Sequence, residues 1–451
     1  MIRLRKILLA IITLICLSAG GASVFAFNEN RPRVNFKETV LKNGLRVITA
    51  EDRSVPVVTT NVIYNVGSRD ERTGLTGFAH LFEHMMFKGS ENVGRGEHFY
   101  QVFTNGGFMN GITNPDRTFY YETVPSNQLE MVLFLEADRM RSLAITKENL
   151  DNQRLAVQEE RRQFVDNAPY GKAEETTQNL LYDNFAYKHV TIGSMEDLNV
   201  ASVEEVSKFF KTYYAPNNAT LTIVGDFDRK NLMALIEKYF TDIPRQPAPP
   251  TVDMTEPEQK EERRQTIESP LAQTAQVRLA FKAVPGGTDD FYALSVLSSA
   301  LQSGQSSRLT QKLVREKELV TGIGGFMDER RGASALYVIA SVRPGKNPAD
   351  VESEIYREIE QIIENSITDA ELQKVKNGIR RDYVNSLRST TNRALLLNIY
   401  ALYYNDPNLI NMRLDKFNRV TKEDVQRVAR KYLKPENRTV VVTVPQTAPK
   451  K

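Results

Sequence analysis

The sequence predicts an α+β protein with two tandem similar domains, each a mostly antiparallel sheet with helices packed on one side. Three observations favour this fold. The chain has 451 residues, which is too long for one ordinary hydrophobic core and suits two domains of about 200 residues each. Segments with the β-branched pattern of strands alternate with segments that have the apolar spacing of amphipathic helices. Two patterns of the first half also recur in the second half.

The N-terminal segment has the features of a secretory signal peptide. Three basic residues within residues 1–6 precede an apolar stretch over 7–20, and a small-x-Ala site ends at Ala26. We therefore expect residues 1–26 to be removed and the protein to be exported, to the periplasm of a bacterium. If the segment is not cut, residues 7–26 are long enough to anchor the chain in a membrane.

Charge and cysteine content narrow the function classes. The formal net charge is +3, and removal of the three basic residues of the signal peptide leaves a formally neutral chain. The remaining chain has no excess of basic charge, so its charge does not favour nucleic acid as a partner. The only cysteine, Cys16, also lies in the signal peptide. The mature chain can therefore form no disulfide and has no thiolate nucleophile.

The predicted elements of the first half alternate between β-rich stretches and helices. Residues 56–65 have the β-branched enrichment of a strand, and residues 106–124 form a second β-rich stretch that an Asn-Pro-Asp turn interrupts. A short helix over 78–85 is expected between them. Two further helices are predicted over 127–140 and 146–160, the first from its amphipathic spacing and the second from the capping residue at its start.

A tandem duplication is the most informative pattern in the sequence. Residues 203–224 resemble residues 422–443, and residues 145–150 resemble residues 367–372 at nearly the same offset. We therefore predict two similar domains joined by a linker rich in Pro, Glu, Lys and Arg. The predicted boundaries are a signal peptide over 1–26, an N-terminal domain over 27–243, a linker over 244–269, a similar C-terminal domain over 270–445 and a tail over 446–451.

A pair of histidines on one helix predicts a metal site. His80 and His84 project from one face of the short helix, and Glu83 lies on the flank of that face. Two neutral imidazoles suit zinc, whose catalytic sites use three protein ligands and keep one position for water. On chemistry alone, the third ligand could be His98, His189 or an oxygen donor elsewhere. No histidine follows His189, so only the first domain is expected to bind metal.

The sequence around these histidines resembles the signature of the pitrilysin and mitochondrial processing peptidase family. Residues 77–89 carry its His-x-x-Glu-His motif, and the resemblance extends over essentially the whole mature chain. It implies a zinc metalloendopeptidase with one Zn²⁺ per chain, which hydrolyses peptides or unfolded segments in a clam-like chamber between its domains. In the mechanism that the resemblance implies, Glu83 is the general base for a zinc-bound water that attacks the scissile carbonyl.

The resemblance also implies the remaining metal ligand. Residues 156–160 match the family's pattern around a third ligand that is a glutamate, which makes Glu160 the expected ligand and the adjacent Glu159 the alternative. Gln153 stands where family members often have a glutamate that supports the site. An amide can still hydrogen-bond a metal ligand, but it adds no negative charge.

Candidate substrate-binding residues follow from the same resemblance. Asn110, Gly111 and Thr113 lie in a segment that resembles the family's edge strand, to which an extended peptide adds by main-chain hydrogen bonds. An ordinary solvent-covered edge strand is the alternative. Arg315 fits an arginine that holds the substrate carbonyl in the family. The tyrosine that accompanies this arginine is missing, because Gly322 occupies its position.

The missing tyrosine bears on the expected partners. We hypothesise that the chain is the zinc-bearing half of a heterodimer in which a similar chain supplies the tyrosine, with a self-sufficient homodimer as the alternative. A non-catalytic structural or peptide-binding subunit of an assembly is a further hypothesis. The complete set of His80, Glu83, His84 and Glu160 argues against a subunit that has lost its site.

Overall fold

The computed structural model describes residues 33–446, and from Val34 onward the chain forms one compact unit. The predicted signal peptide and nearly all of the predicted tail lie outside the described residues. No helix within residues 33–446 is both long and apolar enough to cross a membrane.

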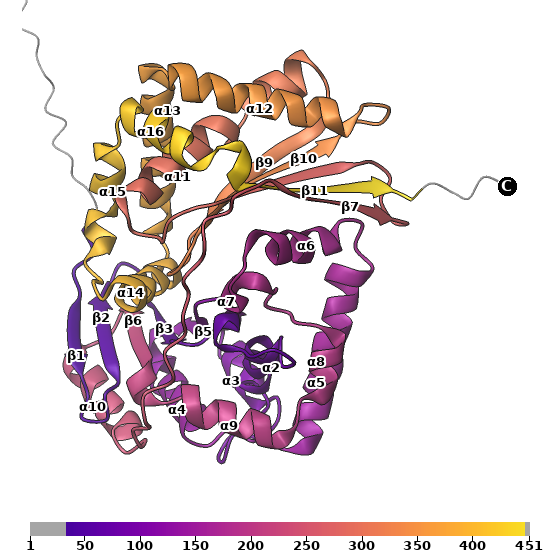
Figure 1. Cartoon of the computed structure of the whole chain (residues 1–451). Helices are drawn as coiled ribbons and strands as arrows, with labels where there is room; N and C mark the ends of the chain where they lie inside the picture. Colours follow the sequence, from indigo (N-terminus) through magenta and orange to yellow (C-terminus); the bar gives the residue numbers. More distant parts are fainter. Residues whose placement is uncertain (1–32, 447–451) are drawn as a thin grey trace, which may run out of the picture. The chain divides into compact units, whose positions relative to one another are not determined.

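Two sheets, one in each half of the chain, form the framework (Figure 1). The first sheet has the order β1-β2-β6-β3-β5-β4 and is antiparallel except for the pair β2–β6. Its strands are β1 (Lys37–Val40), β2 (Arg46–Glu51), β3 (Val57–Tyr64), β4 (Phe108–Thr113), β5 (Thr118–Pro125) and β6 (Ala219–Gly225). The second sheet has the order β7-β11-β8-β10-β9, with β7–β11 as its parallel pair. Its strands are β7 (Arg263–Ser269), β8 (Gln276–Lys282), β9 (Val320–Asp328), β10 (Ala335–Val342) and β11 (Arg438–Pro445).

The strand order reveals the tandem duplication. Five strands of the first sheet have the order β2-β6-β3-β5-β4, and those of the second have the order β7-β11-β8-β10-β9. In each series the first strand along the chain lies beside the fifth, followed by the second, the fourth and the third. The first and fifth strands are the parallel pair in both. Strands β4 and β9 are therefore equivalent, and each is an edge of its sheet. The predicted α+β fold with two similar, mostly antiparallel halves is confirmed.

The segment predicted as a linker is only partly irregular. Residues 244–262 contain no helix or strand, whereas Arg263–Ser269 is β7. Because β7 pairs with β11, the regular structure of the second half begins before residue 270. The compact unit that starts at Val34 has no internal division, so the domain boundaries stay a prediction.

Helices surround both sheets. Those of the first half are α2 (Phe78–Met85), α3 (Glu97–Thr104), α4 (Leu129–Arg141), α5 (Lys147–Arg161), α6 (Gly171–Leu181), α7 (Phe185–Lys188), α8 (Met195–Val200), α9 (Val203–Tyr213) and α10 (Arg229–Phe240). Those of the second half are α11 (Asp289–Gln302), α12 (Pro348–Asn365), α13 (Asp369–Ser386), α14 (Thr390–Tyr404), α15 (Leu409–Arg419) and α16 (Lys422–Tyr432). There are also two π-helical segments: η3 (Arg162–Asp166) follows α5, and η5 (Thr310–Glu316) precedes β9. The single 3-10 turns are η1 (Ser68–Asp70), η2 (Ser126–Gln128), η4 (Pro216–Asn218) and η6 (Pro435–Asn437).

Equivalent threonines start two equivalent helices. Thr146 Oγ1 accepts a hydrogen bond of 3.1 Å from Asn149 N at the start of α5. Thr368 Oγ1 accepts one of 3.2 Å from Glu371 N at the start of α13. A hydroxyl at this position satisfies a backbone N–H that has no partner within the helix. The recurrence of residues 145–150 at 367–372 thus reflects a shared capping structure.

The two halves exchange one helix each. Helix α14 of the second half packs on β3 and β6 of the first sheet, and α6 of the first half packs on β8 and β11 of the second (Figure 1). Leu397 of α14 lies in one cluster with Ile48 and Val224, and Leu181 of α6 lies in another with Tyr337. Each sheet therefore has the helices of its own half on one face and an exchanged helix on the other. Each exchanged helix thus forms a smaller core cluster that the two halves share, beside the main core of each half.

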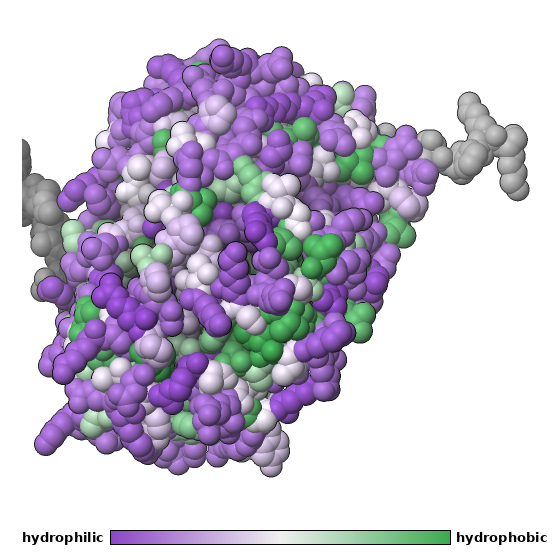
Figure 2. Space-filling model, turned by 60° about the horizontal axis from the view of Figure 1, so that its bottom comes forward, coloured by the Kyte–Doolittle hydropathy of each residue, from purple (hydrophilic) through white to green (hydrophobic). Residues whose placement is uncertain are grey.

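Figure 2 shows that hydrophilic side chains cover most of one face of the molecule, with hydrophobic side chains gathered towards its middle. Large hydrophobic residues with at least half of their surface exposed include Tyr100, Phe103, Phe108, Leu155, Phe164 and Phe326. Two of these, Phe164 and Phe326, line the cavity described below.

Asn398 of α14 provides a test of the shared core. Its side chain is fully buried, accepts a hydrogen bond of 2.6 Å from Thr222 Oγ1 and donates one of 3.0 Å to Asn61 O. Replacing Asn398 by Ala leaves these first-sheet groups unsatisfied, and we expect a loss of about 1–3 kcal/mol in the free energy of unfolding. Urea unfolding measures it, with the exposed Asn377→Ala in α13 as the control. Equal stability of both variants would contradict the shared core.

Candidate metal centre

A buried carboxylate fixes the N-terminus of α2. Gly77 precedes the helix with a φ of 85°, and a Cβ there would lie 2.6 Å from Ile192 O, so the position requires glycine. The backbone N–H groups of Gly77 and Ala79 donate to Glu71 at 2.9 and 2.8 Å. A negative charge at this end also interacts favourably with the helix dipole. The start of α2 is thereby held in place.

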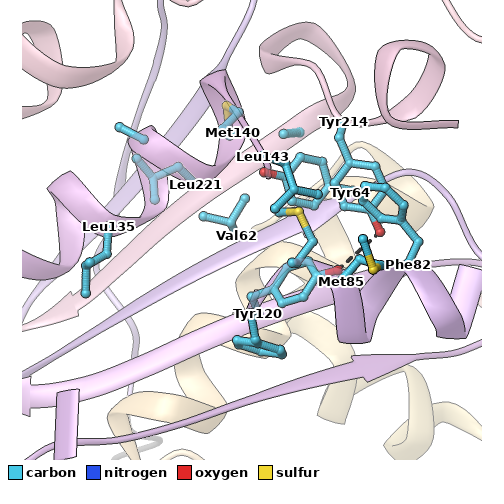
Figure 3. Close-up of a cluster of buried hydrophobic side chains, with 14 of the residues drawn as sticks. Val62, Tyr64, Phe82, Met85, Tyr120, Leu135, Met140, Leu143, Tyr214 and Leu221 are labelled. Atoms are coloured by element: carbon cyan, nitrogen blue, oxygen red, sulfur yellow. Dashed lines mark hydrogen bonds between the residues drawn. The ribbon is translucent and has the colours of Figure 1, made fainter. Parts of the chain in front are cut away.

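The apolar face of α2 is buried in the core of the first half. Figure 3 shows Phe82 and Met85 among Tyr64, Tyr120 and Tyr214, and a hydrogen bond of 3.2 Å joins the hydroxyl groups of Tyr120 and Tyr214. The ring centroids of Phe82 and Tyr214 are 4.2 Å apart. This packing fixes the rotation of the helix about its axis. The face that carries the two histidines is left outside the core.

Three potential metal ligands from α2 and α5 converge. The Glu160 Oε2 atom lies 3.7 Å from His80 Nε2 and 3.5 Å from His84 Nε2. One ligand atom from each of the three residues falls within 4.8 Å of the others. In a tetrahedral zinc site with bonds of about 2.0 Å, neighbouring donor atoms are about 3.3 Å apart. The set of two imidazoles and one carboxylate therefore fits zinc in both chemistry and spacing.

The protonation states of this cluster also suit a cation. Burial, together with the nearby His84, lowers the pKa of His80 to about 4, so its imidazole is neutral at pH 7. The Nδ1 atom of His80 is buried and has no hydrogen-bond partner among the described residues. Hydrogen bonding to His84 lowers the pKa of Glu160, which keeps the carboxylate charged. Metal ligands must be deprotonated in this way to bind.

Glu83 lies beside the cluster and is held by strand β4. Thr113 Oγ1 donates a hydrogen bond of 2.6 Å to Glu83 Oε2. A Cβ on Gly111 would come within 2.9 Å of Glu83 Cγ, so glycine leaves the room that this carboxylate occupies. Burial raises the pKa of Glu83, although the hydrogen bond from Thr113 opposes the shift. A carboxylate with a raised pKa is better suited to accept and return a proton near pH 7.

The other candidate ligands have different partners. His189 Nε2 lies 2.9 Å from Glu71 Oε2, and His98 Nε2 lies 3.2 Å from Glu122 Oε1 in a buried cluster. Glu159 is exposed, and its carboxylate accepts a hydrogen bond of 3.0 Å from Arg162. The structure thus brings Glu160, and neither His98, His189 nor Glu159, to His80 and His84.

The remaining predicted site residues form no hydrogen bond to the three potential ligands in the described structure. The side-chain amide of Gln153 donates to Asn152 at 2.6 Å. Asn110 is exposed, and its side chain accepts a hydrogen bond of 3.0 Å from Gly111 N. Arg315 in η5 is also exposed and donates to Gln305 at 3.1 Å. A Cβ on Gly322 would meet no atom within 4 Å.

A large cavity adjoins Glu160. It has a volume of about 630 Å³, with one wall from α5, η3 and α6 and the other from the second sheet. Residues on its walls include Glu160, Phe164, Tyr170, Arg278, Phe326 and Tyr337. This volume lies within the range of about 300–1,000 Å³ found for pockets that bind drug-sized ligands, so the cavity has room for a short stretch of peptide. Sequence reasoning missed the residues of this second wall, although a charged Arg278 between apolar strand residues was a visible signal.

Two family models match the chain. The model described as "Insulinase (Peptidase family M16)" matches residues 46–195, which include the three potential ligands and Glu83. The model described as "Peptidase M16 inactive domain" matches residues 201–379. That second region follows the last histidine of the sequence. The division agrees with a single site in the first half.

Individual proteins resemble the chain over most of its length. The "Zinc protease PqqE" of Helicobacter pylori is 31% identical over 412 residues, which are 91% of this chain and 93% of that protein. The "Uncharacterized zinc protease Mb2805c" of Mycobacterium bovis is 28% identical over 88% of this chain and 90% of that protein. The crystal structure of a protease from Helicobacter pylori has a TM-score of 0.88 at 31% identity and covers 91% of this chain and 100% of that chain.

Substitution of Glu160 tests the ligand set. Glu160→Gln should weaken zinc binding about a hundredfold or more, because an anionic donor is lost at nearly constant volume. The matched control is Glu159→Gln, which removes an exposed carboxylate one residue away and should change zinc affinity by less than about twofold. Competition with a chromophoric chelator measures both affinities. Unchanged affinity in Glu160→Gln, or an equal loss in both variants, would refute the assignment.

Proposed function

The chain belongs to peptidase family M16, and we propose that it is a zinc endopeptidase that hydrolyses peptides or unfolded segments. The observation that carries this proposal is the convergence of His80, His84 and Glu160 beside Glu83, at the margin of a cavity large enough for a short stretch of peptide. The relatives named as zinc proteases support the same class of reaction.

His80, His84 and Glu160 would together hold one Zn²⁺ per chain. A bound zinc ion polarises a peptide carbonyl and lowers the pKa of a water molecule. The neutral imidazoles and the single carboxylate keep a net positive charge at the site once the cation is bound, which favours both effects. The core around α2 keeps the two imidazoles in position throughout the reaction.

Glu83 would move the proton. Its carboxylate accepts a proton from the attacking water and then gives it to the leaving amine. Thr113 orients the carboxylate through its hydrogen bond of 2.6 Å, and Gly111 leaves space beside it. Burial raises the pKa of Glu83, which brings the carboxylate closer to the range in which both proton transfers are efficient.

Strand β4 would hold the substrate backbone. It is the edge of the first sheet, so its outer main-chain groups can pair with an extended peptide. Gly111 and Thr113 of this strand both contact Glu83. A peptide paired with β4 therefore passes next to the general base. Main-chain pairing of this kind binds many sequences, in agreement with a substrate class of peptides and unfolded segments.

We also propose that the active unit is a dimer and that the protein is exported. Gly322 offers no side chain, and the space beside it is open, so a residue of a second chain has room there. Export rests on the signal-like N-terminal sequence. Adding a similar candidate chain to the purified protein tests the heterodimer by peptide cleavage. Full activity of the chain alone, unchanged by the addition, would contradict the heterodimer.

Glu83→Gln separates catalysis from metal binding. We expect this variant to keep its zinc and to lose activity by about two to four orders of magnitude, because the amide cannot take a proton. Zinc content and cleavage of an unfolded protein substrate measure the two properties. The exposed Glu91→Gln is the control and should cleave like the wild type. Normal cleavage by Glu83→Gln would show that another group is the base.

A further inference from the structure

One face of the second sheet forms the cavity wall opposite Glu160. Val277 and Leu279 of β8 point into the core of the second half, so the alternate residues Arg278 and Ala280 point to the other face. On that face Ala280 is aligned with Tyr337 of β10, and Tyr337 with Phe326 of β9. Arg278, Tyr337 and Phe326 all line the cavity.

Two charged pairs contribute side chains to the cavity. Arg330 is bonded to Asp328 at 2.7 Å, and Glu175 is bonded to Arg161 at 3.1 Å. Arg278 differs, because its guanidinium has no hydrogen bond or ion pair to any described residue and its Nε atom is buried. Burial lowers the pKa of Arg278, and the charge of nearby Glu174 opposes this shift without forming an ion pair.

No described carboxylate lies within ion-pair distance of Arg278, and Glu174 of the same cavity acts on it only at longer range. Phe326 stacks on Tyr337 with ring centroids 4.9 Å apart, and Phe326 is 50% exposed. Across the cavity, Phe164 is 66% exposed. A partly buried cation among aromatic rings is costly unless an anion pairs with it. A ligand that enters the cavity can provide this anion.

We propose that Arg278 binds a carboxylate of the peptide substrate and so makes this chain select peptides by charge. A planar guanidinium pairs with a carboxylate through two parallel hydrogen bonds. The carboxylate is either the C-terminus of the peptide or an Asp or Glu side chain. Aromatic neighbours favour apolar residues next to it. This inference rests on the proposed peptidase function and adds a specificity residue to it.

Peptide binding to the zinc-loaded Glu83→Gln protein tests the proposal without turnover. Fluorescence anisotropy measures the binding of four labelled peptides that are based on one apolar sequence. The first pair differs only in having a free C-terminus or a C-terminal amide. The second pair differs only in having an internal Glu or an internal Gln. We expect one carboxylate peptide to bind about tenfold to a hundredfold more tightly than its neutral match. The pair that shows the preference identifies the source of the carboxylate.

Further substitution of Arg278 in this protein assigns the preference. Arg278→Met and Arg278→Gln should remove it while leaving the neutral peptides unchanged, and Arg278→Lys should retain part of it. Arg381→Met, at an exposed arginine of α13, is the control and should keep the full preference. Zinc content and melting temperature confirm that each variant is folded.

Three outcomes would overturn the proposal: no carboxylate preference with Arg278 present, an equal loss for charged and neutral peptides on substitution, or a preference that persists without Arg278. Failure of the proposed function is a separate result. In that case the wild-type protein with zinc hydrolyses none of the four peptides and no unfolded protein.

Discussion

Helix α2 has eight residues, and a helix of this length is not stable by itself in water. Its position comes from burial of Phe82 and Met85, from the anchor at Glu71 and from packing against α5. The packing that removes the apolar side chains from water also turns His80 and His84 towards α5. The geometry of the candidate metal centre therefore follows from the core of the first half.

The duplicated halves have taken different roles. The first half carries the histidine motif and the edge strand β4, whereas the second carries the equivalent edge β9 and a cavity wall. Exchange of α6 and α14 joins the two halves through shared cores. Because α6 belongs to the first half and packs on the second sheet, it links the two walls of the cavity. A change in the second half can thus alter the substrate site without touching the metal ligands.

Sequence reasoning succeeded where the structure is local. The fold class and the spacing of His80 and His84 follow from strand patterns and helix geometry, and the predicted family is confirmed. Contacts between residues that are distant in the chain were harder to predict. Glu160 came from a family resemblance, and chemistry alone left His98 and His189 open because composition cannot distinguish a metal ligand from a histidine that is bonded to a buried carboxylate. The helix exchange and the unpaired guanidinium in β8 arise from tertiary packing, which no local pattern records.

X-ray absorption at the zinc edge of the purified, zinc-loaded chain tests whether His80, His84 and Glu160 hold the metal. We expect one zinc per chain in a site of low coordination number, with scattering from two imidazoles and with nitrogen and oxygen donors at about 2.0–2.2 Å. The sequence after Ala26 has no cysteine, so no sulfur donor is expected. A six-coordinate site of oxygen donors without imidazole scattering would rule out this set of ligands.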